Sequence, residues 1–431
     1  MKTFVSLCLI IGLTAGCTPF TVLTQASPSP ARPPETLTPG VTATPPPTST
    51  STITPEPTIT ATPTLTSTPT RIPRTPISAA SIQSLSVLAE FKAIGQVDGL
   101  AFLPDGHSLV YSAIGRVSEL GMVNIDNVED RYFFSDANQD AYCRNGAASS
   151  YSIDVTEDGT LLAATAPSGV QVWRLPEKKL LYTFPFLSAG IVQFSPDGSL
   201  LAVGICSYFD TEPENIYEGI KIWDMRSGNQ VEVLEGHVVE AIRISRAGNT
   251  KILTNFFMQL LFSEDGKALL SGGPDPQSKT GIKIWDANSG EIVQSVSISP
   301  YKGAVATSLD FNQSGDTLLT LDQAYEPAIR LWKFENGSIA DPNPIQTIKM
   351  DRDYGLAKFN HKGDLIFTVS TEPMVLVVWS VDTQKIVYQE ELSPEMKIGH
   401  YSTISLDISQ DDTVLAVGGW PGFVRLYAIN Q

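Results

Sequence analysis

A five-residue turn phrase recurs seven times between residues 102 and 412, and this repetition constrains the fold more than any other feature. The clearest copy is Phe194-Ser195-Pro196-Asp197-Gly198. Proline presets φ in such a turn, aspartate bonds the local backbone, and glycine accepts the left-handed conformation that lets a hairpin reverse. The other copies are Phe102 to Gly106, Val155 to Gly159, Phe262 to Gly266, Phe311 to Gly315, Phe359 to Gly363 and Ile408 to Asp412, where aspartate, which also tolerates left-handed backbone, replaces glycine. Seven copies in register predict a repeat fold with a hairpin in every repeat.

A second pattern follows each turn, in which apolar residues alternate with polar ones and lead to an aromatic residue. Ile220-Lys221-Ile222-Trp223 and Ile282-Lys283-Ile284-Trp285 are the clearest examples. Alternation with a period of two predicts half-buried β-strands. The aromatic positions are Trp173, Trp223, Trp285, Trp332, Trp379 and Tyr427. Two of these tryptophans precede an aspartate, and Gly-His dipeptides at residues 236–237 and 399–400 precede two of the repeats.

With these motifs in register, residues 81–431 resemble the WD-repeat β-propeller family. The resemblance implies an all-β fold, a seven-bladed β-propeller with four strands in each blade. The sequence stops a few residues after the strand that contains Tyr427, so the last blade has no outer strand of its own. We expect the segment Leu85 to Phe91 to supply that strand and to close the ring, which would also cover exposed strand edges.

The first 80 residues differ in composition from the rest and predict two further regions. Residues 1–16 have the short apolar stretch of a signal peptide, and Leu13-Thr14-Ala15-Gly16-Cys17 resembles the lipobox of bacterial lipoproteins. That resemblance implies a diacylated Cys17 and a lipid-anchored, extracytoplasmic protein of the cell envelope; the alternative is an ordinary signal peptide. Residues 17–80 are rich in Thr and Pro, with 15 of the 30 prolines between Pro19 and Pro76. Because they offer little apolar surface to bury, we predict a disordered, extended stalk.

The charge of the chain limits its partners. The formal net charge is −17, and residues 1–80 contribute +2 from four basic and two acidic residues, so residues 81–431 carry −19. Nucleic-acid binding requires a basic surface, and an anionic membrane would repel an acidic one. We therefore expect no nucleic-acid partner, and a membrane contact only through the lipid.

Loop lengths differ between the two faces of the predicted propeller. Connections between the first and second strands are uniformly short, and we call their side the short-turn face. Connections between the second and third strands lie on the opposite side, the long-loop face, where the distance from turn glycine to tryptophan grows from 14 residues at Gly159–Trp173 to 25 at Gly198–Trp223. An extra stretch at about 241–257 predicts an additional hairpin there. Variable loops on one face are typical of a binding surface. Its candidate partner-binding residues are Tyr208, Phe209, Asp210, Tyr217, Tyr325 and Trp420, unless these aromatic side chains pack against their own loops.

Other candidate sites are few. Cys143 and Cys206 map to loops of the same face and could form a disulfide, the alternative being a pair of free buried thiols. The family resemblance implies a structural hydrogen-bond network of His237, Ser271, Asp275 and Trp285. Asp136, Asn138 and Asp140 alternate as calcium ligands do, but alanine stands at both the glycine and the glutamate position of an EF-hand loop. Asp154, Asp310 and Asp407 share one place on the predicted innermost strands, where they could face the channel and bind a cation.

The leading functional hypothesis is a noncatalytic scaffold that binds a protein or peptide on the long-loop face and acts as a monomer. Catalytic nucleophile and phosphate-binding motifs are absent from the sequence, and four histidines leave little scope for general-base chemistry. We expect no catalytic residues and no cofactor, with calcium as the one candidate. The alternative is a propeller enzyme, of hydrolase or lactonase type, with a carboxylate-bound metal in the central channel. The fold by itself does not choose between binding and catalysis.

Overall fold

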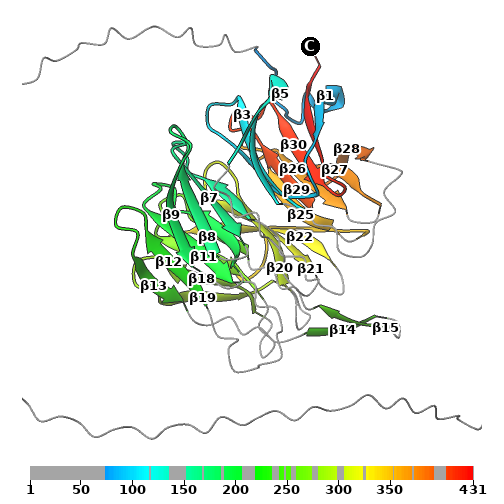
Figure 1. Ribbon diagram of the computed structural model, residues 1–431. Coiled ribbons are helices and arrows are strands. Elements are labelled where there is room, and N and C mark those ends of the chain that lie inside the picture. The colour runs from blue at the N-terminus through cyan, green and yellow to red at the C-terminus, as the bar shows by residue number, and fades with distance from the viewer. Residues whose placement is uncertain are drawn as a thin grey trace, which may run out of the picture. The chain divides into compact units, whose positions relative to one another are not determined.

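The computed structural model describes residues 73–430 except for 116–117, 135–151, 167–168, 186–188, 206–218, 235–241, 247–248, 254–258, 274–279, 299–304, 324–326, 353, 371–372 and 393–403. Within these residues the fold is all-β apart from one 3-10 turn, η1 (Ile82–Ser84). Seven antiparallel sheets form the blades of a β-propeller, and an eighth sheet is a two-stranded hairpin (Figure 1). The predicted fold class is therefore confirmed.

The first three blades follow the chain in order, each from its innermost strand outwards. Blade 1 contains β2 (Gln96–Phe102), β3 (Ser108–Ile114), β4 (Glu119–Asn124) and β5 (Asn127–Phe133). Blade 2 contains β6 (Ile153–Val155), β7 (Leu161–Ala166), β8 (Gly169–Arg174) and β9 (Lys179–Pro185). Blade 3 contains β10 (Ala189–Phe194), β11 (Leu200–Ile205), β12 (Ile220–Asp224) and β13 (Gln230–Leu234).

The remaining blades repeat this order with one variation, the split outer strand of blade 5. Blade 4 contains β16 (Gln259–Phe262), β17 (Ala268–Gly272), β18 (Thr280–Asp286) and β19 (Ile292–Ser297). Blade 5 contains β20 (Val305–Phe311), β21 (Thr317–Gln323), β22 (Ala328–Glu335) and the short β23 (Ser338–Ile339) and β24 (Gln346–Lys349), which both pair with β22. Blade 6 contains β25 (Tyr354–Phe359), β26 (Leu365–Ser370), β27 (Val375–Ser380) and β28 (Ile386–Glu391). Blade 7 contains β29 (Ile404–Ile408), β30 (Leu415–Gly419) and β31 (Phe423–Ile429).

The ring is closed by the segment expected from the sequence. Strand β1 (Leu85–Lys92) pairs antiparallel with β31, with Leu85 opposite Ile429 and Lys92 opposite Phe423. In Figure 1 the blue β1 lies beside the red strands of blade 7. The innermost strands then contact one another all the way round the ring, including β29 of blade 7 against β2 of blade 1.

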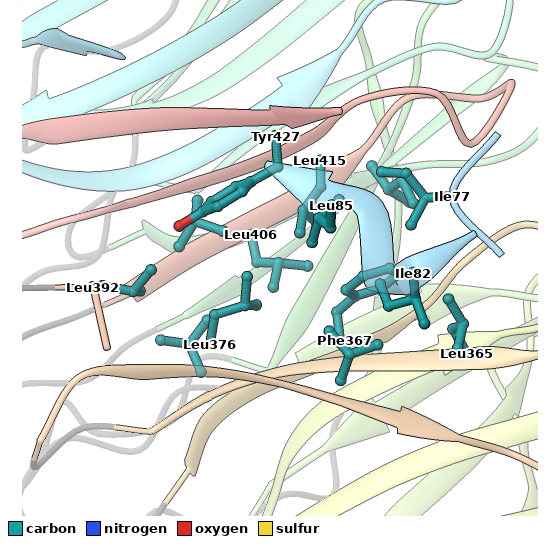
Figure 2. Close-up of a cluster of buried hydrophobic side chains, with 14 of the residues drawn as sticks. Ile77, Ile82, Leu85, Leu365, Phe367, Leu376, Leu392, Leu406, Leu415 and Tyr427 are labelled. Atoms are coloured by element: carbon teal, nitrogen blue, oxygen red, sulfur yellow. The ribbon is translucent and has the colours of Figure 1, made fainter. Parts of the chain in front are cut away.

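Packing against the propeller begins before residue 81, where the sequence placed its start. The side chains of Ile77 and Ile82 are fully buried and join the apolar cluster between blades 6 and 7, as Figure 2 shows. Residues 1–72, with the predicted signal peptide, Cys17 and most of the predicted stalk, lie outside the described residues.

The hydrophobic core lies between neighbouring blades rather than at one centre. The cluster between blades 6 and 7 illustrates this, because Leu365, Phe367 and Leu376 of blade 6 pack on Leu406 and Leu415 of blade 7 (Figure 2). Middle strands are covered on both faces, and β26 and β27 are buried at every position.

The connection from β13 to β16 contains the extra hairpin expected at about 241–257. It consists of β14 (Ile242–Arg246) and β15 (Asn249–Leu253), paired antiparallel through five residue pairs. The connection joins an outer strand to the next inner strand, so it belongs to the long-loop face.

Candidate functional site

The recurring turn phrase forms the short-turn face, and its polar residues serve the turn itself. In blade 3 the Ser195 hydroxyl donates to the Asp197 carboxylate at 2.7 Å, and the Ser199 N–H donates to the same carboxylate at 3.0 Å. The Ser195 hydrogen bond is the main reason why the pKa of Asp197 lies below its ordinary value. Gly198 has a φ of 66°, the left-handed conformation that the phrase predicted. The aspartates of the turn phrase, of which Asp197 is the example, therefore stabilise the hairpin turns.

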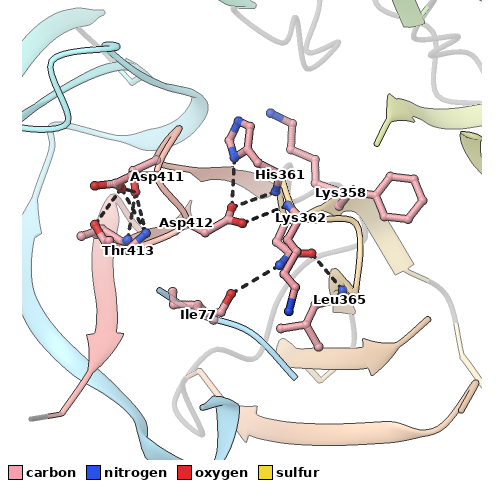
Figure 3. A network of polar contacts seen from close by, with 12 residues as sticks. Ile77, Lys358, His361, Lys362, Leu365, Asp411, Asp412 and Thr413 are labelled. Atoms are coloured by element: carbon pink, nitrogen blue, oxygen red, sulfur yellow. Dashed lines mark hydrogen bonds and ion pairs between the residues drawn. The ribbon is translucent and has the colours of Figure 1, made fainter. Parts of the chain in front are cut away.

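Asp412 connects two blades on this face (Figure 3). Its φ is 57°, so it adopts the glycine conformation that the sequence suggested it would tolerate. Its carboxylate also accepts the backbone N–H groups of His361 and Lys362 at 2.8 and 3.0 Å, and lies 3.0 Å from His361 Nδ1. The aspartate that stands in place of glycine thus joins the turn of blade 7 to the turn of blade 6.

The three aspartates expected on the innermost strands each hold the next blade. Asp154 accepts the backbone N–H of Phe194 at 2.6 Å, and Asp310 accepts that of Phe359 at 2.7 Å. Asp407 completes the set by accepting the backbone N–H of Phe102 at 2.8 Å, across the junction between blades 7 and 1. Each of these carboxylates therefore has a structural role, because it holds the innermost strand of the next blade through one oxygen atom.

Lys358 of blade 6 supplies positive charge among these aspartates. Its ammonium lies 2.5 Å from Asp407, and it interacts electrostatically with Asp310 and Asp154 as well. Burial raises the pKa of Asp154 to about 7 and that of Asp310 to about 6. Burial by itself would lower the pKa of Lys358, but the Asp407 and Asp310 carboxylates hold this pKa above its ordinary value. A lysine therefore takes the place in which the sequence suggested a bound cation.

The described part of the chain contains no group of three His, Cys, Asp or Glu side chains placed to hold a metal ion. The candidate calcium ligands Asp136, Asn138 and Asp140 lie outside it, as do Cys143 and Cys206 of the predicted disulfide.

Two members of the expected hydrogen-bond network lie within the described residues. The Trp285 indole Nε1–H donates to Ser271 Oγ at 2.8 Å, whereas His237 and Asp275 lie outside the described residues. Blades 5 and 6 repeat this bond with threonine, from Trp332 to Thr320 at 3.0 Å and from Trp379 to Thr368 at 3.1 Å. Neither threonine was predicted from the sequence, although both lie in second strands, as Ser271 does.

On the long-loop face, the junction of blades 7 and 1 exposes two large apolar side chains. Trp420, between β30 and β31, is 47% exposed, and Ile94, between β1 and β2, is 61% exposed. The two loops are joined because the Ala93 N–H donates to the Gly422 carbonyl at 2.8 Å. A Cβ at Gly422 would lie 2.5 Å from the Ala93 carbonyl oxygen, so this approach requires glycine.

Glu119 supports the same junction from blade 1. Its carboxylate accepts the hydroxyl of the fully buried Tyr111 at 2.5 Å and the N–H of Ile94 at 3.4 Å. Burial, together with this carboxylate, raises the pKa of Tyr111 above its ordinary value. We call Ile94, Glu119 and Trp420 the junction patch. The other candidates for this face, Tyr208, Phe209, Asp210, Tyr217 and Tyr325, lie outside the described residues.

The fold defines the class of protein as a seven-bladed β-propeller. Residues 393–428 match the family model described as WD domain, G-beta repeat, a range that includes β29, β30 and all of β31 except its last residue. This match and the seven blades together support a WD-repeat β-propeller, as the turn phrases and tryptophan columns predicted. No curated protein matches the chain. Among the residues described, no helix has the length and apolar character needed to cross a membrane.

Proposed function

We propose that this chain is a noncatalytic scaffold that binds a protein or peptide partner on its long-loop face. WD-repeat propellers commonly act as protein-interaction scaffolds, and the junction patch is the observation that carries the proposal here. Trp420 and Ile94 are exposed on loops whose backbones are hydrogen bonded to each other and supported by Glu119. Aromatic residues on a rigid base make effective binding anchors, because little conformational freedom is lost when a partner docks.

The polar groups of the channel support binding rather than catalysis. Asp154, Asp310 and Asp407 accept backbone N–H groups of neighbouring blades and share the charge of Lys358. A metal-dependent hydrolase would need carboxylates free to coordinate the ion. Equilibrium dialysis of the purified protein against calcium and zinc tests this distinction, and a stoichiometric, tightly retained ion would contradict the scaffold proposal.

We also propose that a lipid on Cys17 tethers this scaffold to a membrane outside the cytoplasm. The lipobox-like sequence supports the proposal, and so does the acidic charge of residues 81–431, which gives the propeller no attraction of its own to an anionic surface. The Thr- and Pro-rich residues 17–80 would serve as the stalk. Acyl chains contribute roughly 0.8 kcal/mol of membrane affinity for each buried CH₂ group.

Site-specific photocrosslinking tests the binding face. A photoreactive residue at Trp420, introduced into the full chain in intact cells, should form a discrete adduct with the partner. The same residue at Val231, which is 52% exposed on the outer strand of blade 3, is the matched control and should not. Deletion of the long loop from residue 206 to 217 should weaken the adduct if both loops contact one partner. Equal adducts at both positions, or none at Trp420, would contradict the proposed face.

A further inference from the structure

Residues 73–84, which we call the N-terminal strap, cross the short-turn face from blade 1 to blade 6 before the chain becomes β1. Arg74 binds Asp126 in the turn between β4 and β5 of blade 1. Further along the strap, the Ile77 N–H donates to the Asp412 carbonyl of blade 7 at 2.7 Å. Gln83 then donates from Nε2 to the Val387 carbonyl of blade 6 at 2.6 Å. The strap therefore contacts three consecutive blades, including both blades that flank the ring-closing junction.

The first attachment is a partly buried ion pair. The Arg74 side chain is only 8% exposed, and the Asp126 carboxylate that binds it also lies 2.6 Å from His107 Nδ1. His107 directly follows the turn phrase of blade 1, so the Asp126 carboxylate links Arg74 to both hairpin turns of that blade. An ion pair shielded in this way is weakened less by salt than an exposed one.

The second attachment is apolar. Ile77 and Ile82 are fully buried between blades 6 and 7, where they pack with Leu365 and Leu415 (Figure 2). The Asn360 side-chain amide donates to the Ile77 carbonyl at 3.3 Å, and the Ala79 N–H donates to Asp364 at 3.4 Å (Figure 3 shows the polar bonds around Ile77). Both backbone groups of Ile77 are thus bonded, one to each blade.

The strand that follows the strap is vulnerable to tension. In the antiparallel pair of β1 and β31, Leu85 is the first residue of β1 and lies opposite Ile429. A force that lifted Leu85 away from the blade would break the ladder one residue pair at a time from that end, because successive pairs would be loaded in turn rather than together. The side chains of β1 give limited help, since Val87 and Leu88 are 47% and 40% exposed.

We propose that the N-terminal strap acts as a strain relief, meaning that it bears tension arriving through the preceding residues before β1 does. It thereby keeps β1 from peeling off β31. Pulling on the chain before Pro73 loads Arg74 and Ile77 first, and Leu85 is loaded only after both have been released. The physiological meaning of this device rests on the proposed tether, since a tethered propeller with a bound partner is under tension along this path. The order in which the strap and β1 are loaded, however, is a property of the isolated protein and does not depend on the tether.

Optical-trap pulling on the full chain tests the proposal. One handle is attached at the N-terminus and the other at an azide-bearing residue in place of Asn288, an exposed turn position in blade 4. The first opening event in the wild type should release the strap and β1 together, about 20 residues or roughly 70 Å of extended chain. Ile77→Ala and Arg74→Ala should each lower the force of this first event, and Ile77→Ala should lower it more.

Two matched variants separate strain relief from general destabilisation. Thr75→Ala changes an exposed strap residue and should leave the first event unchanged. Leu201→Ala opens a cavity in the fully buried core of blade 3 and should lower the force of later unfolding events without changing the first. First events at wild-type force in both Ile77→Ala and Arg74→Ala would overturn the proposal, as would an equal decrease in Leu201→Ala. A lack of lipid on Cys17 would leave these results unaffected, so failure of the tether proposal is distinguishable.

Discussion

Asp412 combines two properties that usually exclude each other, a left-handed backbone and a side chain that carries several bonds. Its φ of 57° disfavours most residues with a Cβ, and its carboxylate accepts two backbone N–H groups from blade 6. Asp412→Gly removes the bonds but relieves the backbone, whereas Asp412→Ala removes the bonds and keeps a Cβ in that conformation. Each lost hydrogen bond costs about 1 kcal/mol, and a Cβ in left-handed backbone costs about 1–2 kcal/mol.

We therefore predict that the free energy of unfolding decreases from wild type to Asp412→Gly and decreases further to Asp412→Ala. Urea denaturation of the three proteins, followed by tryptophan fluorescence, measures the order. An Asp412→Gly variant more stable than the wild type by the whole backbone cost of about 1–2 kcal/mol would show that the bonds to His361 and Lys362 contribute nothing.

The channel aspartates predict an unusual dependence of stability on pH. Because burial raises the pKa of Asp154 to about 7 and of Asp310 to about 6, against an ordinary value of 3.8, the folded protein holds more protons than the unfolded chain between these limits. The free energy of unfolding must then fall as pH rises from about 4 to 7. The two shifts total about five pKa units and one unit corresponds to about 1.4 kcal/mol, so the two groups together should contribute a decrease of at most about 7 kcal/mol.

Asp154→Asn isolates one of these contributions. The asparagine carbonyl can still accept the Phe194 N–H, but it does not titrate, so the variant should show a shallower slope between pH 5 and 8. Asp197→Asn is the matched control, because the pKa of Asp197 is lowered and its titration falls below this window. Urea denaturation at constant ionic strength measures both slopes. An unchanged slope in Asp154→Asn would refute the assignment of this pH dependence to the channel.

At the scale of the strands, the sequence contained most of the information for the fold. The alternating column Ile220 to Trp223 became β12, and the segment from Leu85 became the outer strand of blade 7. The first signal is local, since alternation follows from the residues themselves, whereas the second came from counting strands, because the last repeat lacked an outer strand. Lys358 was also within reach, because alignment of the repeats places it where three other blades have aspartate.

The strap, in contrast, had no local signal. Ile77 stands next to Pro76 at the end of a Thr- and Pro-rich tract, and it is buried against residues about 290 to 340 positions later, such as Leu365 and Leu415. The partner of Arg74 is equally remote in sequence, since Asp126 lies in another blade's turn. The junction patch was predicted only through Trp420, because the proximity of Ile94 arises from ring closure.

Truncations separate the roles of the N-terminal elements. A chain that begins at Pro73 retains every described contact and should have the same melting temperature as the full chain. A chain that begins at Leu85 lacks the strap and should melt several degrees lower, because it loses the burial of Ile77 and Ile82. A chain that begins at Ala93 lacks β1 as well, exposes the edge of β31, and should fail to fold stably. Circular dichroism measures the series, and equal stability of the first and third proteins would disprove closure by β1.

At the scale of the whole molecule, the propeller and the predicted leader differ in the features that could attach them to a membrane. The propeller is strongly acidic and the described residues contain no membrane-spanning helix, while the leader is nearly neutral and offers a cysteine after a short apolar stretch. The proposed tether and the proposed role of the strap are connected, because tension on such a tether would arrive through the residues that precede the strap.

Cys17→Ser provides the decisive test of the tether. Without a thiol at residue 17 no acyl chain can be attached, so the variant should leave the membrane fraction and lose incorporation of labelled fatty acid. Cys8→Ser, which changes the other cysteine of the leader, is the matched control and should remain membrane-bound and labelled. High salt should not release the wild type, because the acidic propeller contributes no electrostatic attraction that salt could screen. If Cys17→Ser remained in the membrane fraction and the wild type took up no fatty acid, attachment would have to come from the apolar leader itself or from the partner held at the long-loop face.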